Sequence, residues 1–234
     1  MIISDRLFRR YRFLSINNPA ISTHCETLLD DSNDNNIMTS EGERHFTCKV
    51  KRDYQGKITH VKIDDPSVKV IPKEAFSCWC NSIKGNYGNQ DYSRLIHVEL
   101  SEGLERIDKG AFHICTSLER VKIPSTVKVI GGYAFEGCTQ LMHVELSEEG
   151  LESIVHRAFS GCTSLERIRI PSTVKVIGEY SFAECTQLMN VELEEGLERI
   201  DRGAFRNCTS LQRIRIPSTV KVIGRKAFWG CYQL

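Results

Sequence analysis

The sequence predicts a solenoid of about seven stacked turns, in which short parallel strands are joined by turns or short helices. Nine residues, Ile-Pro-Ser-Thr-Val-Lys-Val-Ile-Gly, recur unchanged at 123–131, 170–178 and 216–224. Weaker relatives of the form Leu-Ser/Glu-Glu-(Glu)-Gly-Leu-Glu-x-Ile lie halfway between these copies, so the underlying period is about 23 residues. A period of this length with regularly placed leucines is typical of a leucine-rich solenoid, whose units bury their apolar faces only by stacking.

The N-terminal region does not share the period. Residues 1–44 contain the polar run Asp30–Asn36 and are expected to form a mobile leader, with at most a short basic amphipathic helix near Arg6–Phe13. The charges at the start of the chain interrupt the apolar segment that a secretory signal requires. The sequence therefore favours a cytoplasmic over a secreted protein, and organelle targeting stays open.

The repeat domain is expected to span residues 45–234. Phe46–Tyr54 is predicted to be a strand that covers the N-terminal end of the stack, because a terminal unit has an open face. One loop insertion, residues 84–94, is rich in Gly, Asn and Tyr. This composition is typical both of tolerated surface insertions and of binding loops, so Tyr87 and Tyr92 are candidate binding residues.

Each unit begins with Leu-x-x-Val/Ile-x-Ile/Leu, which places apolar residues at positions one, four and six and predicts a short strand with one inward face. We call the units in which Ile-Pro-Ser-Thr ends this strand proline units, and those in which glutamates and glycine end it glutamate units. A second apolar pair follows, and then Gly-x-x-Ala-Phe-x-x-Cys predicts a tight helical or turn segment. Its phenylalanines are expected to form a continuous spine: Phe76, Phe112, Phe135, Phe159, Phe182, Phe205 and Phe228.

Six of the ten cysteines follow the same period. They are Cys115, Cys138, Cys162, Cys185, Cys208 and Cys231. Residues at one repeat position stack along a solenoid, and a small, half-apolar thiol suits a buried column. We expect reduced core thiols and neither disulfides nor zinc ligands, since the thiols lie one per turn and do not converge.

The complete motif, Leu-x-x-Ile-x-Ile-Pro-Ser-Thr-Val-x-x-Ile-Gly-x-x-Ala-Phe-x-x-Cys-Thr-Ser-Leu, resembles the BspA-like (treponemal-type) leucine-rich repeat family over residues 46–234. The resemblance implies a parallel-stranded solenoid that acts in adhesion or protein recognition. It implies no catalytic residues and no cofactor.

Position five of the first strand points outward and alternates in sign. Its residues are Lys62, Glu99, Lys122, Glu145, Arg169, Glu192 and Arg215. Adjacent strands lie about 4.8 Å apart, so each carboxylate is expected to lie between two cations. The second apolar segment shows the same alternation, from Lys69 to Lys221. These carboxylates are therefore interpreted as neutralised neighbours, and not as a catalytic acid and base.

Position three has no acidic residue and is the candidate binding column. It contains His60, His97, Arg120, His143, Arg167, Asn190 and Arg213. This composition favours an acidic or hydrogen-bond-accepting protein partner. The net charge of +1 gives no indication of nucleic-acid binding. No apolar run is long enough to cross a membrane. A metal site at His60 and His97 is not expected, because a third ligand is lacking.

These features predict a protein-interaction scaffold without catalysis. The nucleophile-elbow, dinucleotide-binding, P-loop and zinc-protease motifs are absent from the sequence. Two alternatives remain open: a regulatory or adhesion segment of a larger protein whose active domain lies outside this chain, and a purely structural array. The oligomeric state is not predicted.

Overall fold

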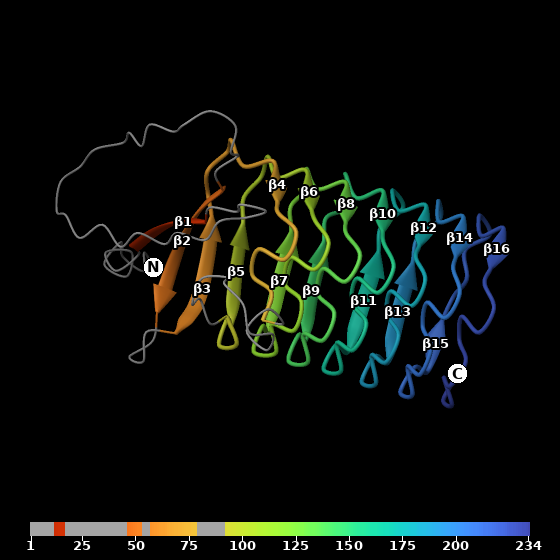
Figure 1. Ribbon diagram of the computed structural model, residues 1–234. Helices are drawn as coiled ribbons and strands as arrows, with labels where there is room; N and C mark the ends of the chain where they lie inside the picture. Colours follow the sequence, from red (N-terminus) through yellow and green to blue (C-terminus); the bar gives the residue numbers. More distant parts are fainter. Residues whose placement is uncertain (1–11, 17–45, 53–56, 79–91) are drawn as a thin grey trace, which may run out of the picture.

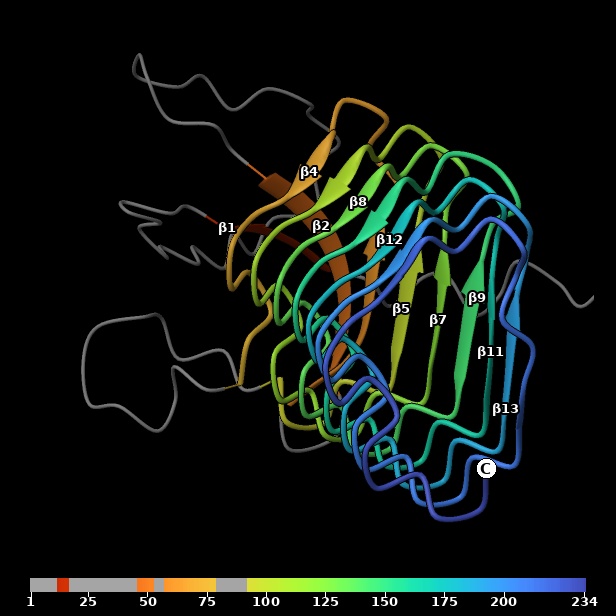
Figure 2. The ribbon, with the colours of Figure 1, turned by 90° about the vertical axis from the view of Figure 1, so that its right-hand side faces the viewer.

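The computed structural model describes residues 12–16, 46–52, 57–78 and 92–234. These residues form a solenoid in which one turn follows another along a single stack (Figure 1). Seen along the stack, the first strands of the turns lie on one side, the second strands lie across from them, and irregular segments connect the two (Figure 2). The predicted fold class is confirmed.

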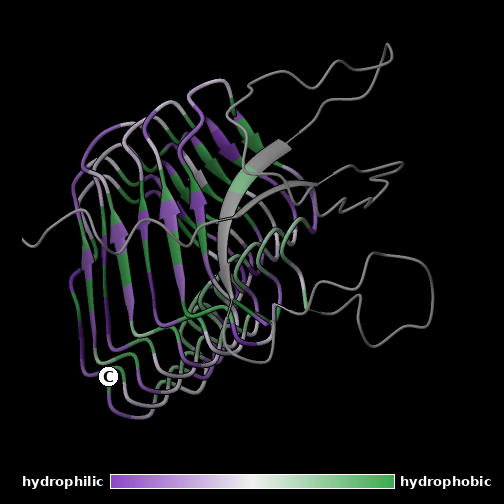
Figure 3. Ribbon diagram, turned by 90° about the vertical axis from the view of Figure 1, so that its left-hand side faces the viewer, coloured by the Kyte–Doolittle hydropathy of each residue, from purple (hydrophilic) through white to green (hydrophobic). Residues whose placement is uncertain are grey.

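The first strands of the turns form what we call the first face. They are β3 (Ile58–Ile63), β5 (His97–Leu100), β7 (Arg120–Ile123), β9 (His143–Leu146), β11 (Arg167–Ile170), β13 (Asn190–Leu193) and β15 (Arg213–Ile214). Neighbours pair in parallel from β3 to β9 and again from β11 to β15, so the first face consists of two sheets that meet between β9 and β11. Hydrophilic and hydrophobic residues alternate along these strands (Figure 3), as expected for one buried side.

The second strands are two residues long and form one parallel sheet. They are β4 (Val70–Ile71), β6 (Arg106–Ile107), β8 (Val129–Ile130), β10 (Ser153–Ile154), β12 (Val176–Ile177), β14 (Arg199–Ile200) and β16 (Val222–Ile223). From β4 to β14, the isoleucine of each strand is fully buried. The second sheet thus closes the core opposite the first face.

Two antiparallel strands cover the N-terminal end of the stack. The strand β2 (Phe46–Arg52) pairs with β3, which confirms the predicted capping strand. The strand β1 (Arg12–Ile16) pairs in turn with β2. The helix expected near Arg6–Phe13 is wrong at Arg12 and Phe13, which lie in β1, and the remainder of that segment falls outside the described residues.

The third side of each turn contains no helix within the described part of the chain. From the turn of Gly110 onward, two residues per turn have positive φ there, one two positions before the spine phenylalanine and one before the cysteine, as in Gly203 (φ 61) and Asn207 (φ 59). A residue in the left-handed region interrupts a right-handed helix. The backbone instead bonds to the neighbouring turn: the Phe159 N–H donates to the Ser181 carbonyl at 2.8 Å.

The phenylalanine spine is confirmed. Neighbouring rings from Phe76 to Phe228 are stacked, with centroids 5.1 to 5.5 Å apart and planes within 11° of parallel. The six phenylalanines from Phe76 to Phe205 are fully buried. The spine is therefore a continuous core that no single turn can make alone.

The cysteine column lies beside the spine, and its six cysteines are free thiols in the structure. Each thiol donates to the carbonyl of the phenylalanine in the preceding turn, as Cys162 does to Phe135 at 3.3 Å. Burial raises the pKa of the Cys162 thiol well above its usual value and that of Cys185 to about 12. Cys231 is only half-buried, and its hydrogen bond with Cys208 lowers its pKa.

This difference predicts selective alkylation. Because the thiolate is the reactive form, Cys231 is expected to react with iodoacetamide in the native protein while Cys138, Cys162 and Cys185 stay unmodified until denaturant is added. Peptide mass spectrometry over a time course measures the order. Equal labelling of all four thiols in native buffer would contradict the buried column.

Candidate functional site

The position-three residues form one continuous column across each part of the first face. The strand register sets His60 beside His97 and His97 beside Arg120. Beyond the division of the sheet, it sets Arg167 beside Asn190 and Asn190 beside Arg213. The inward residues at positions four and six anchor each strand in the core, so the column residues are held at the spacing of the strands.

Most of the column is exposed, and its arginines are not neutralised. Arg120, His143, Arg167, Asn190 and Arg213 are exposed, whereas His60 and His97 are half-buried. No described residue forms an ion pair with Arg120, Arg167 or Arg213. Three guanidinium groups, each with five donors, therefore face solvent on one surface.

The neighbouring position-five column is largely neutralised, but its pairing differs from the prediction. Lys62 lies 3.2 Å from Glu99, and Lys122 lies 2.8 Å from Glu145. Arg169 contacts two loop glutamates, Glu148 at 3.2 Å and Glu194 at 3.1 Å. The expectation that each carboxylate lies between two cations is wrong, because the long arginine side chain reaches the loops that follow the strands.

A row of apolar side chains borders the column and was not predicted from the sequence. Position two carries Ile96, Met142 and Met189 in the glutamate units. Ile96 and Met189 are 36% and 39% exposed. The sequence does contain the pattern that predicts this row, an apolar residue at position two of every second unit. Methionine and arginine are both enriched in protein interfaces.

Two of the three histidines of the column, His60 and His97, lie at its N-terminal end. Their ring centroids are 5.8 Å apart, and His97 Nε2 lies 3.7 Å from Glu99. Among the described residues, no group of three histidine, cysteine or acidic side chains could hold a metal ion.

The two tyrosines proposed for the insertion have separate outcomes. Tyr87 lies outside the described residues. Tyr92 is 6% exposed and packs edge-on against Phe76, with ring centroids 5.3 Å apart. The prediction that Tyr92 is a binding residue is wrong, because its ring covers the first phenylalanine of the spine.

A charged cluster lies on the third side of the turns. Glu136 is flanked by His113 Nε2 at 3.3 Å and by Arg157 Nη1 at 3.2 Å. Burial disfavours the Glu136 carboxylate, but the contacts with His113 and Arg157 outweigh it and lower the pKa of this group. Glu136 therefore joins three successive turns, those of His113, Glu136 and Arg157.

This lowered pKa predicts a pH-dependent contribution to stability. A carboxyl group with a depressed folded pKa stabilises the fold above its unfolded pKa of about 4.3, and this contribution is lost as pH falls through the folded value. Glu136→Gln is thus expected to lower the urea midpoint at pH 7 and to have little effect at pH 3. Glu179→Gln, an exposed carboxylate on the same side, is the control and should change little at either pH. An equal loss at both pH values for Glu136→Gln would contradict an ionic role.

A shallow depression of about 350 Å³ lies at the C-terminal end of the first face. It is lined by Asn190–Glu195 and Arg213–Arg215, so it joins the last two column residues to the glutamate loop after β13.

No helix that could cross a membrane occurs among the described residues.

Comparison with known proteins agrees with this architecture. The model of the BspA type leucine rich repeat region matches residues 105–234 in six copies. A crystal structure of a leucine-rich repeat protein from Eubacterium ventriosum is 26% identical with a TM-score of 0.60, and the match covers 72% of this chain and 42% of that one. A leucine rich cell surface protein from Faecalibacterium prausnitzii is 25% identical with a TM-score of 0.56, covering 86% and 54% of the two chains.

This chain thus spans about half the length, or less, of both solved structures. No curated protein matches it. The motif copies, the parallel solenoid and the match over more than half of the sequence establish that the chain belongs to the BspA-type leucine-rich repeat family.

Proposed function

We propose that this protein is a non-catalytic interaction scaffold that binds an acidic protein surface through the position-three column. The observation that carries the proposal is the contrast between two adjacent columns on the first face. Three of the four position-five cations, Lys62, Lys122 and Arg169, are paired with glutamates, and Arg215 is the exception among the described residues. Arg120, Arg167 and Arg213 are exposed and form no ion pair with a described residue.

The apolar row at position two supplies the second component of an interface. Exposed Ile96 and Met189 border a positively charged stripe, and a partner that covers both would bury apolar surface while pairing its carboxylates with arginine. Family membership supports protein interaction or adhesion in general terms. The cell-surface description of the Faecalibacterium prausnitzii protein favours adhesion as a second candidate, in which the same column contacts a host or neighbouring protein.

A triple variant tests the proposal. Arg120→Ser, Arg167→Ser and Arg213→Ser together are expected to weaken partner recovery in a quantitative pull-down at least about tenfold, because exposed arginines that meet carboxylates are frequent hot spots. Arg106→Ser, Arg199→Ser and Arg202→Ser form a control that removes the same charge from exposed positions off the first face, where Arg106 and Arg199 pair with Asp108 and Asp201. Unchanged recovery with the first variant would contradict the proposal, and so would an equal loss with the control.

A further inference from the structure

The two sheets of the first face differ in their histidines. Position three of the strands from β3 to β9 contains three histidines and one arginine: His60, His97, Arg120 and His143. Position three of the strands from β11 to β15 contains two arginines and one asparagine: Arg167, Asn190 and Arg213. The column histidines therefore all lie in the N-terminal part of the stack (Figure 1). We call β3 to β9 the histidine sheet and β11 to β15 the arginine sheet.

The charge of the column depends on pH in the histidine sheet alone. Histidine is the side chain that ordinarily changes charge between about pH 5 and pH 8. With neutral imidazoles, the column of the histidine sheet has a charge of +1, from Arg120, and three protonated imidazoles raise it to +4. The column of the arginine sheet has a charge of +2 throughout this range, because guanidinium groups stay protonated. Acidification thus changes which part of the first face is the more basic.

The three imidazoles border one surface. His143 is exposed, and strand register sets it beside Arg120. His60 and His97 are half-buried, and their ring centroids lie 5.8 Å apart. His60 Nδ1 lies 3.0 Å from the Thr59 hydroxyl oxygen. A partner that covers these four strands therefore contacts all three histidines together.

Along the column, the neighbours of the histidines are cations. Strand register places Lys51 of β2 beside His60. It places Arg120 between His97 and His143. The column thus contains no carboxylate that could neutralise a protonated imidazole.

The positions around the column carry charges of both signs. They are Lys62, Glu99, Lys122, Glu145 and Arg169 at position five, Glu119 and Glu166 at position two, and Arg167 at position three of β11. His97 Nε2 lies 3.7 Å from Glu99, which also lies 3.2 Å from Lys62. Glu145 pairs with Lys122 at 2.8 Å. Both position-five carboxylates of the histidine sheet are therefore already paired with lysine.

We propose that the histidine sheet is an acid-strengthened interaction surface. An acidic protein partner binds it more tightly at about pH 5.5 than at about pH 7.5, because its carboxylates then meet three protonated imidazoles. Carboxylates that contact an imidazole favour its protonated form, so binding also takes up protons. The arginine sheet contributes equally at both pH values. This inference rests on the function proposed for the position-three column and adds the condition under which that column binds most tightly.

Titration calorimetry with an acidic peptide measures the pH dependence. The probe is a capped peptide that repeats Asp-Leu-Asp-Ser, whose aspartates stay ionised at both pH values because their pKa is about 3.9. We expect at least about tenfold tighter binding at about pH 5.5 than at about pH 7.5. We also expect net proton uptake, measured from the heats in two buffers of different ionisation enthalpy. Equal affinities, or no binding at the lower pH, would overturn the proposal.

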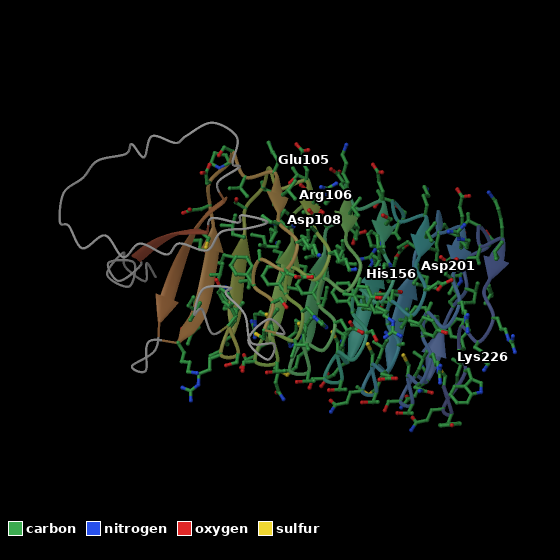
Figure 4. All side chains as sticks on the ribbon, in the orientation of Figure 1. Glu105, Arg106, Asp108, His156, Asp201 and Lys226 are labelled. Carbon is green, nitrogen blue, oxygen red and sulfur yellow. The ribbon has the colours of Figure 1, made fainter. Side chains whose placement is uncertain are left out.

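A triple variant, His60→Gln with His97→Gln and His143→Gln, identifies the groups responsible. It should bring the two affinities to within about twofold of each other and abolish the proton uptake. His113→Gln with His156→Gln is the control, because both histidines lie on the third side of the turns, where Figure 4 shows His156. The control should keep the full ratio, and His156→Gln alone replaces it if the double variant does not fold. A ratio that survives in the triple variant, or that is lost in the control, would overturn the proposal.

Arg167→Ser with Arg213→Ser separates this inference from the proposed function. If the column binds acidic surfaces, this variant weakens binding at both pH values and keeps their ratio. An affinity that the arginine variant leaves unchanged contradicts the proposed function. A pH-independent affinity that the same variant lowers contradicts only the acid dependence. Circular dichroism at both pH values checks that each variant is folded.

Discussion

Replacing Phe159 with alanine should remove about 3–5 kcal/mol from the free energy of unfolding. Its ring is fully buried in the middle of the spine, stacked on Phe135 at 5.2 Å and on Phe182 at 5.3 Å. Truncation leaves a cavity between two rings that cannot close, because the hydrogen bonds between turns fix their separation. Urea denaturation of the purified chain, followed by circular dichroism, measures the loss.

Two further variants keep this result interpretable. Phe228 stacks on Phe205 on one side only and is half-buried, so Phe228→Ala should cost less than Phe159→Ala. Phe159→Leu retains most of the volume and gives a measurable midpoint if the alanine variant does not fold. A loss below about 1 kcal/mol for Phe159→Ala would show that the stacked rings contribute little to the free energy of unfolding.

The parts of the fold that repeat were predictable from the sequence. Phe and Cys recur in register, and a residue that recurs at one position of a solenoid stacks on its own equivalents. The position-three column could be predicted for the same reason, since strand register determines which side chains lie side by side. The capping strand β2 was predictable because an open end requires a cover.

Features that depend on the exact path of one loop were not predictable. The glutamate unit starting at Leu141 has one extra residue in the loop that holds Glu148 and Glu149. In the other turns, the hydroxyls of Thr126 and Thr219 bond to the glutamate loop before them. The hydroxyl of Thr173, which faces the longer loop, is buried without a hydrogen-bond partner. A repeat pattern predicts the average turn, and so it cannot place a single inserted residue.

The site shows the same limit. The exposed arginines were found because their column lacks acidic residues, whereas the apolar row of Ile96 and Met189 was overlooked because it alternates with Glu119 and Glu166. Tyr92 was assigned to a surface loop from the composition around it. Its burial against Phe76 depends on how the chain returns from the insertion, which composition does not encode.

The glycine that ends each copy of the nine-residue motif lies where two turns approach closely. The charge alternation does not explain why glycine is found there. A Cβ added at Gly178 would lie 2.8 Å from the Ile154 carbonyl oxygen and 2.9 Å from the His156 nitrogen. The Gly178 N–H donates to that same carbonyl at 2.9 Å. The glutamate units carry Asp108, Val155 and Asp201 at this position, so the requirement belongs to the proline units alone.

Gly178→Ala is therefore expected to cost about 1–3 kcal/mol, because adjacent backbones must separate to admit the methyl group. Gly161→Ala is the matched control: its φ is +70°, but the nearest atoms to its added Cβ are 3.7 Å away. That variant carries only the left-handed backbone penalty of about 1–2 kcal/mol and should leave the contacts between turns intact. Hydrogen exchange separates the two causes, since only Gly178→Ala should speed exchange at the amides that bridge its turn to the preceding one. If instead both variants leave those amides protected, the glycine is not needed for close approach, and the two unit types differ chiefly in charge.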